Sequence, residues 1–380
     1  MLFTFAGLDP RETEVLERIE AYKEKLKWQL HEPKRWVGSL RRLSFARAIQ
    51  GSNSIEGYDA KLDDAAAVAL GEDPLDADTE TTLALEGYRD AMTYVLQLAN
   101  ETDFEYSIQL IKSLHFMMTK YRLDNRPGLW RLGSVYVRKE ETGQIVYEGP
   151  DIDEVPDLIT ELVAQIKEHA ATPPIVRAGM AHLNLVMIHP FRDGNGRMAR
   201  CLQSLILARS GVLSPVFMSI EEYLGRNTQS YYDILAEVGK GSWQPHNDTR
   251  PWVRYVLRAH LRQAMTLLRR VRESERTWIQ LEDIVDKRSL PGRTIHALFD
   301  ASINFRVRNS TYRGVLRQNG EEITEQTASR DLKQLVDLGL LVPDGERRGR
   351  HYVAGEPIRQ IRRNVITSRD PRDDTDPFAD

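Results

Sequence analysis

The sequence predicts a mainly α-helical protein with one small β-hairpin and a C-terminal winged helix-turn-helix domain. Three observations predict this class. Apolar residues recur at helical spacing through most of the chain. Alternating apolar residues over 133–148 predict the hairpin. Near the C-terminus, three helical stretches precede a short two-stranded pattern, which is the element order of a winged helix.

The composition is that of an ordinary globular protein: 41% of the 380 residues are hydrophobic and 28% are charged. This length allows two or three domains. A formal net charge of −4 offers no overall argument for nucleic-acid binding, so any basic surface must be local. The single cysteine, Cys201, excludes an internal disulfide and fits a reducing compartment. Because neither a signal-peptide pattern nor a membrane-length apolar run occurs, we expect a cytoplasmic protein without a membrane partner.

Residues 1–79 are predicted to form an N-terminal helical region. Asp9-Pro10 caps a first helix, whose apolar stripe includes Leu16, Ile19, Tyr22 and Leu26. A second helix around Trp36–Ala46 runs into the stretch Ser52-Asn-Ser-Ile-Glu-Gly57. The acidic, Ala-rich residues 60–80 predict a short helix and a loop.

Helices are also expected at about 80–99 and 106–120, on either side of a short loop. In the hairpin that follows, Glu141-Thr-Gly143 provides the turn. A lone hairpin among helices is either a surface excursion or a flap whose free edge pairs with an extended peptide, and the residues alone favour the excursion. A further helix carries Val155, Leu158, Leu162 and Ile166 on one face.

The stretch His189-Pro-Phe-Arg-Asp-Gly-Asn-Gly-Arg-Met-Ala-Arg200 organises the chain. An almost wholly apolar segment, 175–188, precedes it, so we expect a buried helix there. A second helix starts near Asn195, and places Arg197 and Arg200 on one face. The unpaired N–H groups and the dipole of its first turn attract anions, and the glycines let a phosphate approach the backbone closely. The loop is therefore predicted to cradle a phosphate.

Beyond the cradle, 219–232 leads into another helix and 240–248 forms a loop. A long helix begins near Pro251, and its arginines (Arg258, Arg262, Arg269 and Arg270) are read as a solvated face. The charge density rises around 275–290, where we expect a linker or a domain boundary.

Residues 276–365 are predicted to be the winged-helix domain. The face of its second motif helix carries Thr327, Ser329, Arg330 and Lys333, and the wing carries Arg347, Arg348 and Arg350. DNA binding and protein docking, including formation of a homodimer, are both open, because the net charge does not decide between them. The tail, 366–380, is rich in Asp, Arg and Pro and is expected to be disordered.

The stretch from His189 to Arg200 resembles the signature of the Fic (Fido) family, HPFx(D/E)GNGRxxR, at every specified position. The resemblance implies a Fic catalytic core, 80–275, in which the hairpin is the flap. It also implies an enzyme, a nucleotidyltransferase that moves AMP from ATP to a Ser, Thr or Tyr hydroxyl of a target protein or of the protein itself.

The resemblance also assigns roles to residues of the signature. His189 would be the base that takes the hydroxyl proton, and Asp193 would bind Mg²⁺. The backbone at Gly194, Asn195 and Gly196 would hold phosphates, with a side-chain donor from Asn195, and Arg197 would grip them as a fork. Family members that transfer a phosphoryl group carry Lys where Gly196 stands. Gly196 therefore favours nucleotidyl transfer, although another nucleotide is an alternative.

A second motif, with Ser52, Glu56 and Gly57 at its specified positions, is similar to the family's inhibitory motif (S/T)xxxE(G/N). Its place upstream of the core is that of the class II type. The resemblance implies that Glu56 pairs with Arg200, so that Arg200 cannot hold the γ-phosphate of ATP. Tyr231 and Tyr232 fall in a segment similar to one that follows the family core, and are candidates for the nucleotide pocket.

The leading hypothesis is an autoinhibited protein adenylyltransferase that uses ATP and Mg²⁺. Two alternatives stay open. One is a DNA-binding regulator whose Fic core senses a nucleotide. The other is the reverse reaction, removal of AMP, in which Glu56 would position water.

Overall fold

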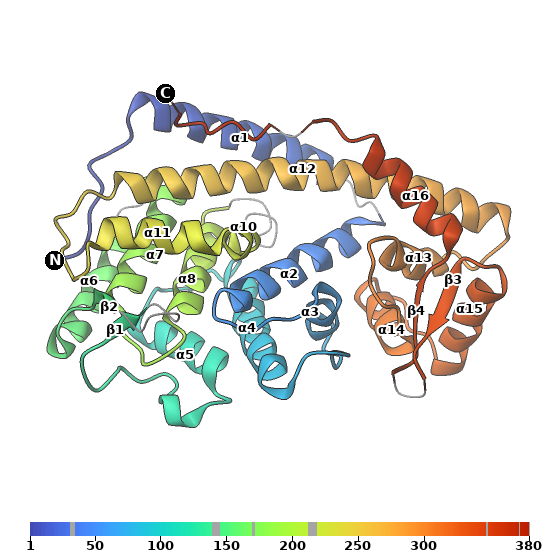
Figure 1. Ribbon diagram of the computed structural model, residues 1–380, viewed down its shortest axis with the longest axis horizontal. Helices are drawn as coiled ribbons and strands as arrows, with labels where there is room; N and C mark the ends of the chain where they lie inside the picture. Colours follow the sequence, from blue (N-terminus) through green and yellow to red (C-terminus); the bar gives the residue numbers. More distant parts are fainter. Residues whose placement is uncertain are drawn as a thin grey trace.

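The computed structural model describes residues 1–30, 35–138, 145–168, 172–211, 219–346, 349–371 and 373–379. Helices dominate it, as the sequence predicts (Figure 1). In chain order the elements are α1 (Pro10–Leu30), α2 (Val37–Ser54), α3 (Leu62–Ala69), α4 (Thr79–Leu98), α5 (Ile108–Thr119), η1 (Leu123–Asn125), β1 (Tyr136–Arg138), β2 (Ile145–Glu148), η2 (Ile152–Glu154), α6 (Val155–Glu168), α7 (Pro174–Ile188), α8 (Asn195–Arg209), α10 (Glu221–Arg226), α11 (Thr228–Gly239), α12 (Arg250–Lys287), α13 (Thr294–Ser302), α14 (Asn309–Gln318), α15 (Glu325–Asp337), β3 (Leu341–Asp344), β4 (His351–Ala354) and α16 (Glu356–Thr367).

Helices α7 and α8 form the centre of the core. Pro174 begins α7, where its missing N–H costs nothing, and nearly every side chain of the helix is buried. Cys201 of α8 is buried as well and behaves as a small apolar residue. Apolar burial on both helices holds the loop between them, residues 189–194, on a rigid base.

The first helix begins as the sequence predicts. Asp9 accepts a hydrogen bond from the Glu12 N–H at 2.8 Å, and the Glu12 carboxylate accepts one from the Asp9 N–H at 2.8 Å, which is a reciprocal cap. Glu12 is fully buried and also pairs with Arg250 at 2.6 Å and Arg254 at 3.0 Å. These ion pairs fasten α1 along α12 (Figure 1).

Helix α12 differs from the expectation in two respects. It continues without a break to Lys287, so the segment expected to be a linker is helical at 275–287. Its arginines are also not simply solvated: Arg270 donates to the buried carboxylate of Glu222, and Arg262, 9% exposed, donates to the backbone carbonyls of Asp373 and Thr375. Apolar residues along the other faces of α12 pack into the hydrophobic core over the length of the helix. This packing keeps 275–287 helical although the segment is rich in charged residues.

The tail is ordered over its described residues, contrary to the expectation of disorder. Helix α16 runs to Thr367, and the chain then follows α12 and α1 (Figure 1). Asp376 pairs with Arg258 at 2.7 Å, and the guanidinium of Arg254 lies 5.4 Å from the ring centroid of Phe378. Asp376, one of the acidic residues that suggested disorder, thus pairs with an arginine of α12.

The predicted hairpin is present as β1 and β2, which pair antiparallel with an irregularity between Val137 and Arg138. The expected turn, Glu141-Thr-Gly143, lies outside the described residues. Glu148 of β2 forms a parallel bridge with Ser242, and its N–H donates to Gly241 at 3.0 Å. The outer edge of β2 is thus occupied by the loop before α12, and no described strand pairs with the outer edge of β1.

The C-terminal segment contains α13, α14 and α15, the antiparallel pair β3–β4, and α16. This is the helix, helix, helix and hairpin order that the sequence predicts. Arg347 and Arg348 of the expected wing lie outside the described residues, and Arg350 is exposed with its guanidinium 5.9 Å from the Tyr352 ring centroid.

Ion pairs of two arginines, Arg42 and Arg306, join this C-terminal segment to the N-terminal region. Arg42 of α2 and Asp300 of α13 form a buried ion pair, with side chains 4% and 6% exposed. Arg306 contacts Asp63, and its other donors reach Asp64 at 3.0 Å and Asp76 at 2.7 Å. Helix α2, which leads into the Glu56 stretch, is therefore tied at its N-terminal half to the far end of the chain.

Candidate functional site

The loop between α7 and α8 turns sharply at both ends. His189 ends α7 in the left-handed region, with φ 51°, and its N–H donates to Leu185 at 3.0 Å. Gly194 precedes α8 with φ 75°, and a side chain there would come within 2.9 Å of Thr119. A non-glycine residue with positive φ is costly, and such residues gather at functional sites. The fold therefore holds His189 in a strained conformation at the entrance to the loop.

The His189 ring is oriented by a backbone carbonyl. Its Nδ1 lies 3.2 Å from the carbonyl oxygen of Val186. Because a carbonyl only accepts, the proton is on Nδ1 and Nε2 carries the free lone pair. Burial lowers the pKa of His189, although the Val186 carbonyl and the charges of Glu56 and Asp193 oppose the shift. A neutral imidazole with a free Nε2 is suited to accept a proton.

Asn195 holds the loop in shape. Its amide oxygen accepts from the Phe191 N–H at 2.9 Å, and its amide nitrogen donates to the Phe191 carbonyl at 2.9 Å. The side chain is 2% exposed. The sequence-based expectation of an Asn195 side-chain donor to phosphate therefore differs from this structure, in which Asn195 offers a ligand its backbone N–H.

Asp193 presents a carboxylate at the edge of the loop, with its side chain 33% exposed. One oxygen accepts from the Gly194 N–H at 2.7 Å, and the other accepts from Asn125 at 3.1 Å. No group of three or more His, Cys, Asp or Glu that could hold a metal occurs among the described residues. A single carboxylate beside a phosphate site suits Mg²⁺, which binds one or two carboxylates together with substrate phosphates.

Arg197 is fully buried behind the loop. Its Nη1 donates to the Tyr121 hydroxyl at 3.0 Å, and its guanidinium lies 5.2 Å from the ring centroid of Tyr58. Its Nη2 is 3.8 Å from the Asp193 carboxylate, and neither Nε nor Nη2 has a hydrogen-bond partner among the described residues. Buried donors without partners are costly, and a bound phosphate would satisfy them.

Arg200, 1% exposed, is held by the second motif. Its Nε donates to the Ser52 hydroxyl at 2.8 Å, and its Nη2 donates to the Ser52 carbonyl at 2.9 Å and to the Glu56 carboxylate at 2.6 Å. Its Nη1 is buried without a hydrogen-bond partner among the described residues. The predicted pairing of Glu56 with Arg200 is confirmed, and Ser52 contributes two further contacts.

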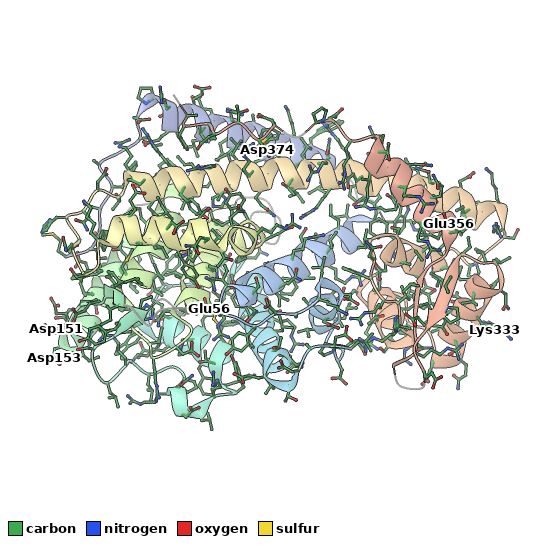
Figure 2. The ribbon with its side chains drawn as sticks, viewed as in Figure 1. Glu56, Asp151, Asp153, Lys333, Glu356 and Asp374 are labelled. Carbon is green, nitrogen blue, oxygen red and sulfur yellow. The ribbon has the colours of Figure 1, made fainter. Side chains whose placement is uncertain are left out.

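Glu56 also lies against the first turn of α8. A methyl group at Gly196 would come within 2.4 Å of the Glu56 Oε1 and 3.0 Å of the Arg200 Nη1. Gly196 therefore permits this close approach, which a side chain at that position would obstruct. In Figure 2 the Glu56 label lies near the middle of the molecule, at the end of α2. The carboxylate sits where the helix N-terminus attracts an anion.

The turn that carries Glu56 is fixed on several sides. The N–H of Gly57 donates to Ser54 and the N–H of Tyr58 donates to Asn53, both at 3.1 Å, and these bonds close the end of α2. From α11, Tyr232 donates its hydroxyl to the Ile55 carbonyl at 2.8 Å. Of the two predicted pocket tyrosines, Tyr232 therefore supports the turn that carries Glu56.

Tyr231 is placed in the core, 1% exposed. Its hydroxyl is 2.9 Å from the Nε2 of His182, and Trp252 packs beside both rings. The position of Tyr231 thus reflects helix packing rather than an exposed pocket wall.

Sequence reasoning missed several residues that build the site. Tyr58 and Tyr121 cover Arg197, and their hydroxyls lie 3.1 Å apart. Arg131, 5% exposed, donates to the His189 carbonyl at 3.1 Å and to the Gly133 carbonyl at 2.6 Å, and so links the loop to the start of the hairpin. His115 lies beneath the loop, stacked on Phe191. Except for Tyr58, which follows the second motif directly, they stand far from both motifs along the chain, where no spacing signal could mark them.

In the C-terminal segment, the four residues of α15 that were predicted to form its binding face differ in their exposure to solvent. Ser329, Arg330 and Lys333 are exposed, and Thr327 is half-buried. The Ser329 hydroxyl accepts from Asn309 at 2.9 Å. Lys333 lies at the outer edge of the molecule in Figure 2.

A helix N-terminus with two buried arginines, a half-buried carboxylate and a histidine at the entrance makes up the candidate phosphate site, which is built on a helix–loop–helix. Residues 105–207 match the model of the Fic/DOC family, so this segment is a Fic domain. The chain is 38% identical over 126 residues to protein adenylyltransferase fic-1 of Caenorhabditis briggsae, covering 30% of this chain and 22% of that protein. It is 33% identical over 159 residues to the protein of the same name from Caenorhabditis elegans, covering 42% and 28%. The chain thus spans about a quarter of the length of these relatives.

Solved structures agree with the fold. A Fic family protein from Desulfovibrio desulfuricans G20 superposes with a TM-score of 0.58 at 20% identity, covering 92% of this chain and 97% of that one. Fic-1 from C. elegans (residues 134–508) gives a TM-score of 0.53 at 24% identity, covering 69% and 73%. Among the described residues, no helix is both long and apolar enough to span a bilayer.

Proposed function

We propose that this protein is an adenylyltransferase that uses ATP and Mg²⁺ to place AMP on a hydroxyl side chain of a protein, and that Glu56 holds this activity in check. The observation that carries the proposal is that one loop and the helix after it hold His189, with its Nε2 lone pair free, together with two buried arginines, Arg197 and Arg200. The names of the fic-1 relatives support the choice of AMP.

In the proposed reaction, the target's hydroxyl oxygen forms a bond to the α-phosphorus of ATP. The bond from that phosphorus to the bridging oxygen breaks, and pyrophosphate leaves. The hydroxyl proton passes to Nε2 of His189, while Nδ1 keeps its own proton and donates it in the hydrogen bond to the Val186 carbonyl. His189 is placed for this role by the end of α7, which projects its ring at the entrance to the loop.

The phosphates would be held by the chain around the start of α8. The backbone N–H groups of Gly194, Asn195 and Gly196 are the proposed cradle, and the free donors of Arg197 would bind the phosphate oxygens. Asp193 would be the protein ligand of Mg²⁺, which neutralises phosphate charge when bound. Hydrogen bonds from the Gly194 N–H and the Asn125 side chain already fix the orientation of its carboxylate.

Inhibition would follow from competition for Arg200. While Arg200 donates three hydrogen bonds to Ser52 and Glu56, it cannot bind the γ-phosphate of ATP. The negative charge of the Glu56 carboxylate also repels a phosphate from the start of α8. A charge-assisted hydrogen bond contributes about 1.5–3 kcal/mol, a bias on the order of tenfold to a hundredfold. The contact with Gly196 adds steric exclusion to this bias.

The test uses purified parent protein, Glu56→Gly and Glu56→Gly/His189→Ala with ATP labelled at the α-phosphate. We expect protein labelling to rise in the single variant and to disappear in the double variant. In parallel, ATP labelled at the γ-phosphate should leave protein unlabelled. Equal labelling by parent and Glu56→Gly would refute the inhibition, and transfer of the γ-label would refute adenylyl transfer.

The reverse reaction is a second candidate, favoured by a carboxylate held at the phosphate site. Glu56 is 20% exposed and could orient water toward an AMP-modified hydroxyl. Protein labelled by the Glu56→Gly variant is therefore incubated with the parent protein. Loss of label with the parent, but not with Glu56→Gln, assigns AMP removal. Mass spectrometry of the labelled protein identifies the modified Ser, Thr or Tyr.

For the C-terminal segment, 276–365, we propose a winged-helix module that docks protein, including a second copy of the chain. The exposed charged residues of α15 are Arg330, Lys333, Glu325 and Asp337, two cations and two carboxylates with no net charge. A helix that reads DNA normally presents net positive charge to phosphates. An electrophoretic shift with a steep salt dependence would reverse this preference in favour of DNA.

A further inference from the structure

His115 lies on α5, outside both motifs, and is 1% exposed. The Gly128 N–H donates to its Nδ1 at 2.8 Å, and its Nε2 is 2.8 Å from the Asp193 carbonyl oxygen. Because an N–H only donates and a carbonyl only accepts, Nδ1 is the acceptor and Nε2 carries the proton. Two backbone groups thus fix one tautomer of His115, and both ring nitrogens are used.

The same ring forms the floor of the loop. It stacks on Phe191 with centroids 3.6 Å apart and planes 2° apart. A side chain at Gly194 would come within 2.9 Å of Thr119, one turn after His115, and within 3.5 Å of the His115 Nε2. Residues 191–194 therefore rest directly on α5.

We propose that His115 is a positioning residue for Asp193, and through Asp193 for the divalent cation; this inference rests on the proposed function. His115 donates to the Asp193 backbone carbonyl, while Gly194 and Asn125 donate to the two oxygens of its carboxylate. Both nitrogens of His115 are committed, so it does not ligate the cation itself. Groups behind a metal ligand that fix its direction typically change metal affinity about tenfold or more when lost.

Three substitutions separate this role from general packing. His115→Gln keeps an amide donor near the position of Nε2, so it can still bond to the Asp193 carbonyl. His115→Asn keeps an acceptor near Nδ1 for Gly128 but loses the donor. His115→Phe keeps the ring that stacks on Phe191 and loses both hydrogen bonds. A structural role alone predicts that Phe is the mildest change, whereas the positioning role predicts that Gln is.

The experiment measures Mn²⁺ affinity by electron paramagnetic resonance, with full-length protein carrying Glu56→Gly. The nucleotide is an ATP analogue with a methylene bridge between the α- and β-phosphorus, which cannot transfer AMP. We expect His115→Gln to stay within about threefold of its parent, and His115→Asn and His115→Phe to bind Mn²⁺ about tenfold more weakly. His296→Phe is the matched control, because His296 is a buried histidine of α13 far from the loop, and it should not change the affinity.

Several results would overturn the inference: equal losses in all three variants, the smallest loss in His115→Phe, loss of the fold in all three, or no Mn²⁺ binding by the parent. Thermal unfolding of each variant identifies loss of the fold. A parent that binds Mn²⁺ and the analogue but labels no protein with AMP would refute the proposed function, whereas the order of the Mn²⁺ affinities would still decide the role of His115.

Discussion

The Glu56 carboxylate and Gly196 are in direct contact, since a methyl group at position 196 would lie 2.4 Å from the Glu56 Oε1. This contact puts the carboxylate at the N-terminal turn of α8, beside the guanidinium of Arg200. The Glu56 carboxylate therefore contacts two parts of the candidate phosphate site at once, the N-terminal turn of α8 and Arg200.

Gly196→Ala is expected to destabilise the parent protein, because the added methyl forces Glu56 away from Arg200. Overpacking typically costs about 1–3 kcal/mol. In the Glu56→Gly background most of this cost should vanish, since the clashing atom is gone. Chemical denaturation of the four proteins of this double-mutant cycle measures the coupling. Additive effects would show that Glu56 does not contact position 196 in solution.

Glu56→Gln is expected to raise AMP transfer less than Glu56→Gly does. The amide can still accept a hydrogen bond from Arg200, but it lacks the charge that strengthens the bond. Initial rates of α-phosphate incorporation, compared at equal protein concentration, rank the parent and the two variants. A rate for Glu56→Gln equal to that of Glu56→Gly would mean that charge alone maintains the inhibition.

Asp300→Asn is expected to loosen α2 and so raise AMP transfer, by less than Glu56→Gly does. The change leaves the buried guanidinium of Arg42 without its carboxylate partner. Breaking one side of a buried ion pair costs about 3–5 kcal/mol, so the melting temperature should also fall. Melting curves and α-label incorporation are measured on the same preparation.

The matched control is Asp331→Asn, which breaks another pair of the C-terminal segment. Asp331 is 1% exposed and pairs with Arg293 at 2.7 Å. This variant should lose stability without gaining activity, because the broken pair does not involve α2. A similar gain of activity in both variants would assign the effect to general destabilisation rather than to α2.

The pH dependence should reveal the partly buried environment of His189. Burial lowers its pKa below the ordinary value of 6.5, and the base is active only when neutral. The rate of AMP transfer should therefore hold as the pH falls to 6.5 and decline only below it. Removing Glu56, whose charge raises the pKa of His189, should move this decline to still lower pH. Profiles of kcat/KM against pH for the parent and Glu56→Gly check both points.

The sequence alone determined what depends on neighbours along the chain. Helices with strong apolar periodicity, the cap at Asp9 and the helix–loop–helix from 175 to Arg200 were predicted because their contacts are local. The order of the tail was not, since it depends on contacts with the arginines of α12, such as the ion pair between Asp376 and Arg258. The amino-acid composition of a segment does not indicate which distant residues will contact it.

Tertiary structure decided everything that joins distant segments. Glu56 and Arg200 are 144 residues apart, and only the family resemblance predicted their contact. His115 against Asp193, Tyr121 against Arg197 and Arg42 against Asp300 left no sequence signal. The physical reason is that the spacing of residues along the chain predicts only which of them share one face of a helix or one loop. Contacts between helices are set by the packing of buried faces, which is fixed only when the whole core assembles.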